Sequence, residues 1–332
     1  MTARAAALAV VAVLGTVSCG TPLIKLPSGV GAPAADAGGA VAQATSACRA
    51  VRTLTAEIAV SGSSGGHRVR GRLLAGVSAP ASVRLEAVAP FGPPLFIFVA
   101  TGDDATLLLP RDDRALEHGR PDAVLAAITG VRLGAADLHA LLTGCPLAPA
   151  EPAQGRQMGD RWRVVPAGRE TELYFHRERD AAPWRLVAFV RRNGTGQRAW
   201  RAEFGDFQGD LPRSIHVTST ESVTSDAGFD LHLALSQVDI NVPLEADVFR
   251  VQIPKTAVPT SLEELRRSGP LAAPGKTGRV GDESAGVTDD GRRRSSASTR
   301  QDPSGGRRGS SLSLRGRSTG RAQGPVNEQW SP

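Results

Sequence analysis

Apolar and polar residues alternate with a period of two through most of residues 43–260, and this pattern constrains the fold more than any other feature. It is clearest in "FDLHLALSQVDIN", where Leu231 and Leu233 point to one side of an extended chain and Asp230 and His232 to the other. About eleven segments show the alternation, and turns such as "SGSSGG" and "TGDD" separate several of them. The pattern predicts about eleven strands, many of which pair in sequence order as an antiparallel sheet.

The period changes to 3.6 residues in the middle of this region, which predicts a pair of helices. "RPDAVLAAITG" begins at Pro121 and ends at Gly130, and "GAADLHALLTGCP" ends at Gly144. A third, short helix is expected in "QATSACRAVRTL". A sheet of so many strands tends to curl or split. We therefore expect a mainly β (α+β) domain over residues 43–260: an incomplete antiparallel β-barrel capped by helices, with an apolar cavity.

The amino-terminal residues are typical of a signal peptide that ends in a lipid anchor. Residues 1–18 contain the short apolar run "AAALAVVAVLGTV" and one charge, Arg4. "LGTVSCG" resembles a bacterial lipobox, with Thr16 where leucine is usual. The expected modification is a diacylglycerol and an N-acyl chain on Cys19, and palmitate is a typical chain. The alternative is ordinary signal cleavage nearby with Cys19 unmodified. Residues 19–42 are rich in Gly, Ala and Pro, which favours a flexible tether.

Residues 261–332 differ from the rest in composition. They contain 13 Lys and Arg but 8 Asp and Glu, so they hold +5 of the net charge of +6. Trp330 is their only aromatic residue. Such a segment buries too little apolar surface to offset the entropy of ordering it, so we expect a disordered basic tail. Its partner would be an anionic envelope surface, or it has no partner; nucleic acid is not expected of an exported protein.

No motif for catalysis or metal binding was found in the sequence. The histidines show no HExxH spacing, there is no CxxC, and no GxSxG, P-loop or dinucleotide-binding fingerprint occurs. His232 alternates with apolar residues, which favours an outward strand position over a ligand. We therefore expect a protein that is not an enzyme, with no metal site and no cofactor besides the lipid on Cys19. Once Cys19 is modified, Cys48 and Cys145 remain as an even pair in an oxidising compartment. A disulfide between them is expected, and two buried free thiols are the alternative.

The turn "AVAPFGPPLFIF" places a large apolar side chain where few neighbours are available. Phe91 stands between Pro90 and Gly92, with Leu95 shortly after. Proline and glycine mark a surface turn. Either the turn folds inward and Phe91 belongs to the core, or Phe91 contacts something other than water.

The stretch from Ser82 to Pro146 resembles the outer-membrane lipoprotein receptor LolB. The shared features are "VRLEAVAPFG", "LFIF" and "LAAITGVRLGAADLHALLTGCP", in the same order and at similar spacing. "LSQVDINVPLEADVFRVQIP" is similar to the last strand and closing segment of LolA/LolB-like folds. The resemblance implies an incomplete barrel of about eleven strands whose apolar cavity holds acyl chains. It also implies a protein that accepts lipoproteins from a periplasmic LolA-like carrier and passes them to the outer membrane.

The resemblance gives Phe91 a role. In LolB-like proteins a hydrophobic residue in the matching turn protrudes and is needed to deliver lipoproteins. Pro90, Phe91, Gly92 and Leu95 are accordingly the candidate residues for membrane or cargo contact. The basic tail, Cys48 and Cys145 depart from the family pattern, so a lipid-binding paralogue with another cargo stays open. So does a structural or envelope-sensing lipoprotein that acts through a protein partner.

The anchor yields a direct test. Gly20 follows Cys19, at the position where an aspartate would resemble an inner-membrane retention signal. We therefore expect attachment to the periplasmic face of the outer membrane. A Cys19→Ser protein should move from the membrane to the soluble periplasmic fraction on cell fractionation. If the variant stays with the membrane, the anchor lies elsewhere.

Overall fold

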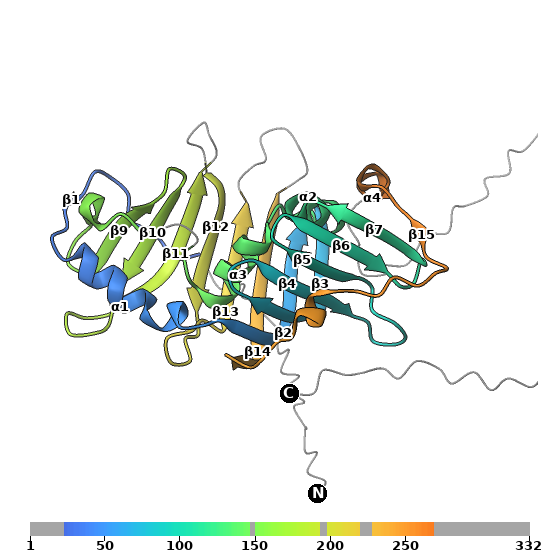
Figure 1. Cartoon of the computed structure of the whole chain (residues 1–332). Helices are drawn as coiled ribbons and strands as arrows, with labels where there is room; N and C mark the ends of the chain where they lie inside the picture. Colours follow the sequence, from blue (N-terminus) through green and yellow to red (C-terminus); the bar gives the residue numbers. More distant parts are fainter. Residues whose placement is uncertain (1–22, 147–149, 193–197, 220–227, 269–332) are drawn as a thin grey trace, which may run out of the picture. The chain divides into compact units, whose positions relative to one another are not determined.

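The backbone of the computed structural model forms one sheet of fifteen strands, with helices packed on it (Figure 1). The structure describes residues 23–146, 150–192, 198–219 and 228–268, so Cys19 and residues 269–332 lie outside the described residues. The strand order is β1-β8-β9-β10-β11-β12-β13-β14-β2-β3-β4-β5-β6-β7-β15. The strands are β1 (Ala32–Pro33), β2 (Thr53–Ser64), β3 (His67–Ser78), β4 (Ser82–Val88), β5 (Ile97–Thr101), β6 (Asp104–Leu109), β7 (Arg114–Gly119), β8 (Arg156–Gln157), β9 (Trp162–Ala167), β10 (Thr171–His176), β11 (Arg185–Arg192), β12 (Arg198–Gly205), β13 (Ser214–Ser219), β14 (Phe229–Ile240) and β15 (Val258–Pro259).

Two antiparallel meanders, β2 to β7 and β8 to β14, make up this sheet. The pairing of β14 with β2 joins them. The sheet is open, and the short strands β1 and β15 form its two ends. The β2–β3 turn places Gly65 and Gly66 at φ of 56° and 75°, a conformation that favours glycine. The predicted open, mainly β architecture is therefore confirmed in its coarse form.

The predicted number of about eleven strands is not confirmed. Each of the eleven predicted segments forms a strand, but the sheet also contains β1, β7, β8 and β15. Three of these are two residues long, and a pair of residues is too short to show alternation. β7 has the sequence "RALEHG", in which two buried residues are adjacent and the pairing with β6 is irregular. An irregular strand shows no period of two, so the pattern did not reveal it.

The helices lie against one apolar core. They are α1 (Ala37–Arg49), α2 (Pro121–Thr129), α3 (Ala135–Thr143) and α4 (Leu262–Ser268), with two short 3₁₀ turns at Pro152–Gln154 and Ala246–Phe249. Helix α1 packs on β9 to β11, α2 on β6 and α3 on β3 and β4. Gly130 and Gly144 end α2 and α3 in the left-handed conformation, as their sequence predicted. No helix among the described residues is long and apolar enough to cross a membrane.

The segment interpreted as a flexible tether is packed on the sheet over its described part, from residue 23. Helix α1 begins at Ala37, six residues before the expected domain start at 43. Just before it, the Asp36 carboxylate accepts two hydrogen bonds from the buried Arg163 guanidinium, at 2.6 and 2.9 Å. Hydrogen bonding to Arg163 holds the pKa of Asp36 below its ordinary value. These tertiary contacts order a Gly/Ala-rich segment whose composition alone favours flexibility.

The ordered chain also continues past the expected boundary at 261, into α4. Ser261 begins this helix with reciprocal bonds: its backbone N–H donates to Glu264 Oε2 at 2.8 Å, and its hydroxyl accepts from the Glu264 N–H at 3.2 Å. This capping box follows from the sequence "SLEE". Leu265 is buried in the same core cluster as residues of α2, which gives this turn of helix an apolar packing partner.

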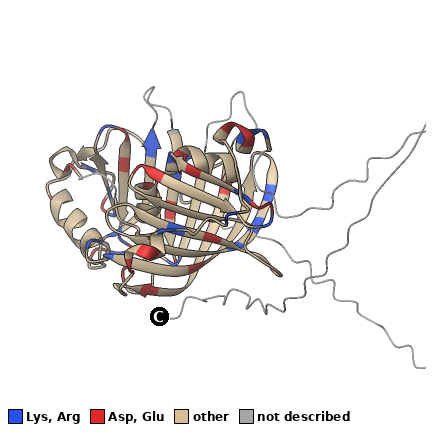
Figure 2. Cartoon of the chain, turned by 45° about the vertical axis from the view of Figure 1, so that its right-hand side comes forward, with Lys and Arg blue, Asp and Glu red and all other residues tan. Residues whose placement is uncertain are grey.

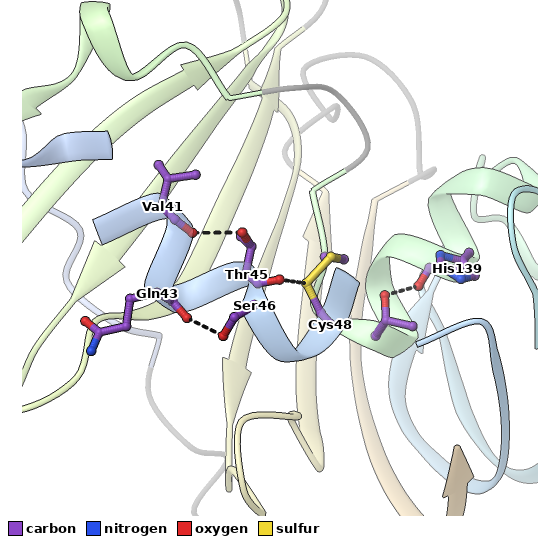
Figure 3. Close-up of a disulfide and its surroundings, with 8 residues drawn as sticks. Val41, Gln43, Thr45, Ser46, Cys48 and His139 are labelled. Atoms are coloured by element: carbon purple, nitrogen blue, oxygen red, sulfur yellow. Dashed lines mark hydrogen bonds between the residues drawn. A yellow bond between two sulfur atoms is a disulfide. The ribbon is translucent and has the colours of Figure 1, made fainter. Parts of the chain in front are cut away.

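A disulfide joins Cys48 at the end of α1 to Cys145 just after α3 (Figure 3). The two Cα atoms are 5.4 Å apart and the residues are separated by 97 positions. The bond connects the helix that covers β9 to β11 with the helix that covers β3 and β4. The disulfide therefore links a helix that packs on the β8–β14 meander to a helix that packs on the β2–β7 meander.

This bond can be checked by counting thiols. Denatured but unreduced Cys19→Ser protein should show no reactive thiol, and two after reduction. Replacing both Cys48 and Cys145 by Ala should lower the free energy of unfolding by about 2–5 kcal/mol, because the loop is long. Two reactive thiols before reduction would reject the disulfide.

Candidate functional site

A cavity of about 190 Å³ lies between the inner face of the sheet and the helix pair α2–α3. Its wall is largely apolar. The apolar side chains come from five strands, two helices and their flanking segments: Ile58, Val60, Val69, Leu73, Leu85, Ala87, Val88, Val217, Leu231 and Leu233 from strands, Leu95 and Phe96 from the turn before β5, and Leu125, Ile128, Val131, Leu133, Leu138 and Leu142 from α2, α3 and the link between them. Such a space suits an apolar ligand.

Strand register explains why these residues meet. Val60 of β2 lies opposite Gly71 of β3 on one side and Leu233 of β14 on the other. With a period of two, residues at alternate positions share a face, so Val69 and Leu73 also face inward. Gly71 creates part of the space: a Cβ added there would meet no atom within 4 Å. The cavity therefore follows from the alternation that predicted the strands.

One side of the cavity is bordered by the part of β3 that extends past its neighbour. Residues His67 to Gly71 pair with β2, whereas β4 pairs only with Arg72 to Ser78. On the outer face of β3, next to this stretch, Arg72 Nε lies 2.9 Å from the Glu57 carboxylate. Arg68 and Arg70 are exposed, and no ion pair joins them to another described residue. Acidic and basic residues are otherwise interspersed over the strands (Figure 2). The cavity thus has free cationic groups beside it.

The turn after β4 projects Phe91 into solvent beside this cavity. Phe91 is 89% exposed, and Pro90 and Gly92 are exposed with it. Leu95 differs, because it is partly buried and lines the cavity. The alternative in which the turn folds inward and Phe91 joins the core is therefore wrong.

Two sets of hydrogen bonds hold this turn in place. The backbone of Ala87 pairs with that of Leu95 and Phe96, at 2.9 and 3.0 Å, and closes the base of the loop. Arg111, in the turn after β6, donates from Nη2 to the Phe91 carbonyl at 2.8 Å and from Nε to the Pro93 carbonyl at 3.2 Å. Arg111 is a positioning residue that sequence reasoning missed, because it lies 20 residues away and belongs to no motif.

A second cluster lies on the opposite, outer face of the sheet. His216 of β13 lies directly opposite His232 of β14, and Asp230 is two residues before His232. The imidazole rings are stacked with centroids 3.7 Å apart. Burial and the neighbouring His216 lower the pKa of His232. The sequence predicted that His232 points outward, as it does. It did not predict the cluster, because only the register of β13 and β14 brings His216 beside His232.

The comparisons give no sequence relative but several structural likenesses. No protein-family model and no curated protein matches the chain. A LolA superfamily protein from Nitrosomonas europaea is similar at 10% identity and a TM-score of 0.47, over 65% of this chain and 97% of that one. An outer membrane lipoprotein-sorting protein domain from Vibrio parahaemolyticus, described as putative, gives 12% and 0.41, over 63% and 94%. The Mycobacterium tuberculosis lipoprotein LppX gives 11% and 0.25, over 63% and 97%. Sequence identities of 10–12% and TM-scores of 0.25–0.47 do not establish a function. The function therefore has to be argued from the cavity and the turn.

Proposed function

We propose that this protein is a lipoprotein of the outer membrane that binds acyl chains in its cavity and takes part in inserting lipoproteins or lipids into that membrane. The observation that carries the proposal is the apolar cavity with the exposed Phe91 beside it. The role requires binding and release, and no catalytic step.

The cavity provides a driving force for binding an acyl chain. Each methylene group moved from water to an apolar environment is stabilised by about 0.8 kcal/mol. The wall contains few polar groups, so a headgroup would stay outside the cavity. Arg68 and Arg70 lie beside it without ion-pair partners among the described residues, and they suit an anionic headgroup.

Phe91 supports the transfer step. Burial of an aromatic side chain in an apolar phase contributes about 1.5–3 kcal/mol, which biases docking but does not anchor the protein. The anchor would be the lipid on Cys19. Arg111 holds the turn with its aromatic tip outward, so little ordering entropy is lost when Phe91 enters the lipid interface.

The packing of the amino-terminal segment limits how far the domain can move from such an anchor. The Ile24 N–H donates to Glu203 Oε2 at 2.9 Å, and its carbonyl accepts from Arg201. Four residues lie between Cys19 and Ile24, and the five Cα–Cα steps that join them span at most about 18 Å. A lipid on Cys19 would therefore keep the domain close to the membrane. A periplasmic LolA-like carrier is the partner proposed for loading, and anionic envelope surfaces are the partner proposed for the basic tail.

The cavity can be tested by filling it. Gly71→Phe should place a ring in the open space, since an added Cβ meets no atom there and the backbone requires no positive φ. We expect at least a tenfold loss of bound acyl chains in native mass spectrometry of protein purified without detergent. Ala59→Phe, which adds the same ring to the outer face of the neighbouring strand β2 at an exposed position, is the matched control. Equal lipid content in Gly71→Phe and wild-type protein, or no lipid in the wild type, would reject the cavity as the binding site.

Phe91 can be tested with the soluble Cys19→Ser protein and vesicles of phosphatidylethanolamine and phosphatidylglycerol. Phe91→Glu should weaken vesicle association about 10- to 100-fold, the equivalent of about 1.5–3 kcal/mol. Its free energy of unfolding should change by less than about 0.5 kcal/mol, because the side chain is exposed. Val258→Glu adds the same charge at another exposed apolar residue and serves as the control. Unchanged association of the Phe91 variant would refute the membrane role.

A further inference from the structure

The outer-face cluster brings three metal-ligating side chains to one point. His216 Nε2 lies 2.7 Å from Asp230 Oδ1, and His232 Nε2 lies 3.9 Å from the same oxygen. One ligand atom from each residue falls within 4.8 Å of the other two. The three side chains therefore surround a single position on the sheet.

The backbone arrangement suits a metal ion. Asp230 and His232 occupy alternate positions on β14, so they share a face, and His216 faces His232 from the adjacent antiparallel strand. A tetrahedral Zn²⁺ ion with ligands at about 2.0–2.2 Å requires ligand atoms about 3.3 Å apart. The distances of 2.7 and 3.9 Å lie on either side of that value. The three ligand atoms lie within 4.8 Å of one another, and side-chain rotation would have to bring them to the tetrahedral spacing when an ion binds.

The surroundings combine rigidity with access from solvent. The His216 side chain is largely buried, that of His232 is partly buried, and that of Asp230 is exposed. Glu203 of β12 lies opposite His216 in the strand pairing, and its carboxylate forms an ion pair with Arg201. Two ligands are thus held in the sheet, while the exposed carboxylate leaves an open side for an ion and its water.

We propose that His216, Asp230 and His232 bind a divalent transition-metal ion, with Zn²⁺ as the best match. Two imidazoles and one carboxylate are ligands that Zn²⁺ prefers, and imidazole argues against Ca²⁺ and Mg²⁺. The ion would replace the hydrogen bond between His216 and Asp230 and connect β13 to β14. This site lies on the reverse side of a cavity wall, since Val217, Leu231 and Leu233 of the same strands line the cavity.

The test is a zinc titration of the full chain without a purification tag. Cys19→Ser should be present in every variant, so that no free thiol competes for the metal. We expect one equivalent of Zn²⁺ to bind with a micromolar or tighter dissociation constant by isothermal titration calorimetry. Co²⁺ should give visible absorption bands of a four-coordinate site. His232→Gln and Asp230→Asn should each weaken binding at least tenfold, with folding checked by circular dichroism.

A matched control is available at His118, whose Nδ1 lies 3.4 Å from Asp104 Oδ2. That exposed pair has the same two chemical groups, and no second histidine joins it among the described residues. His118→Asn, which tolerates the positive φ of 57° there, should leave zinc binding unchanged. The proposal is overturned by equal affinity in wild-type and His232→Gln protein, by loss of binding in His118→Asn, or by wild-type binding only at millimolar zinc.

Discussion

The pairing of β14 with β2 is the interaction on which the rest of the structure depends. It joins strands about 180 residues apart and merges two meanders into one sheet. Gly62 permits the close approach: it has a φ of 139°, and a Cβ added to it would lie 1.9 Å from the Asp230 carbonyl oxygen. Any other residue at this position would strain the junction, because backbone atoms cannot move aside as a flexible side chain can.

The two faces of this junction carry different chemistry because side chains alternate along the strands. Leu231 and Leu233 line the cavity, whereas Asp230 and His232 lie on the outer face. The junction therefore supports the proposed acyl-chain site on one side and the proposed metal site on the other. A shift of register by one residue would exchange the faces and destroy both.

Much of the local structure could be predicted from the sequence, because its signals are short-range. Alternation identified the eleven segments that became strands, and Pro121, Gly130 and Gly144 marked the ends of the helix pair. Proline and glycine around Phe91 indicated a surface turn, although its direction stayed open until the structure placed the side chain outward. β7 and the packed segment before α1 were missed, because irregular pairing and Gly/Ala-rich composition give no periodic signal.

By itself the sequence determined which residues are extended, which are helical and which face of each strand is apolar, because these properties depend on residues a few positions apart. Only the tertiary structure decided which faces meet. Arg111 reaches the Phe91 turn from 20 residues away, and His216 meets His232 only through the register of β13 and β14. Such contacts depend on how whole strands pair. Pairing brings residues far apart in the sequence together, and the chain entropy lost in doing so is offset by the packing of a complete core.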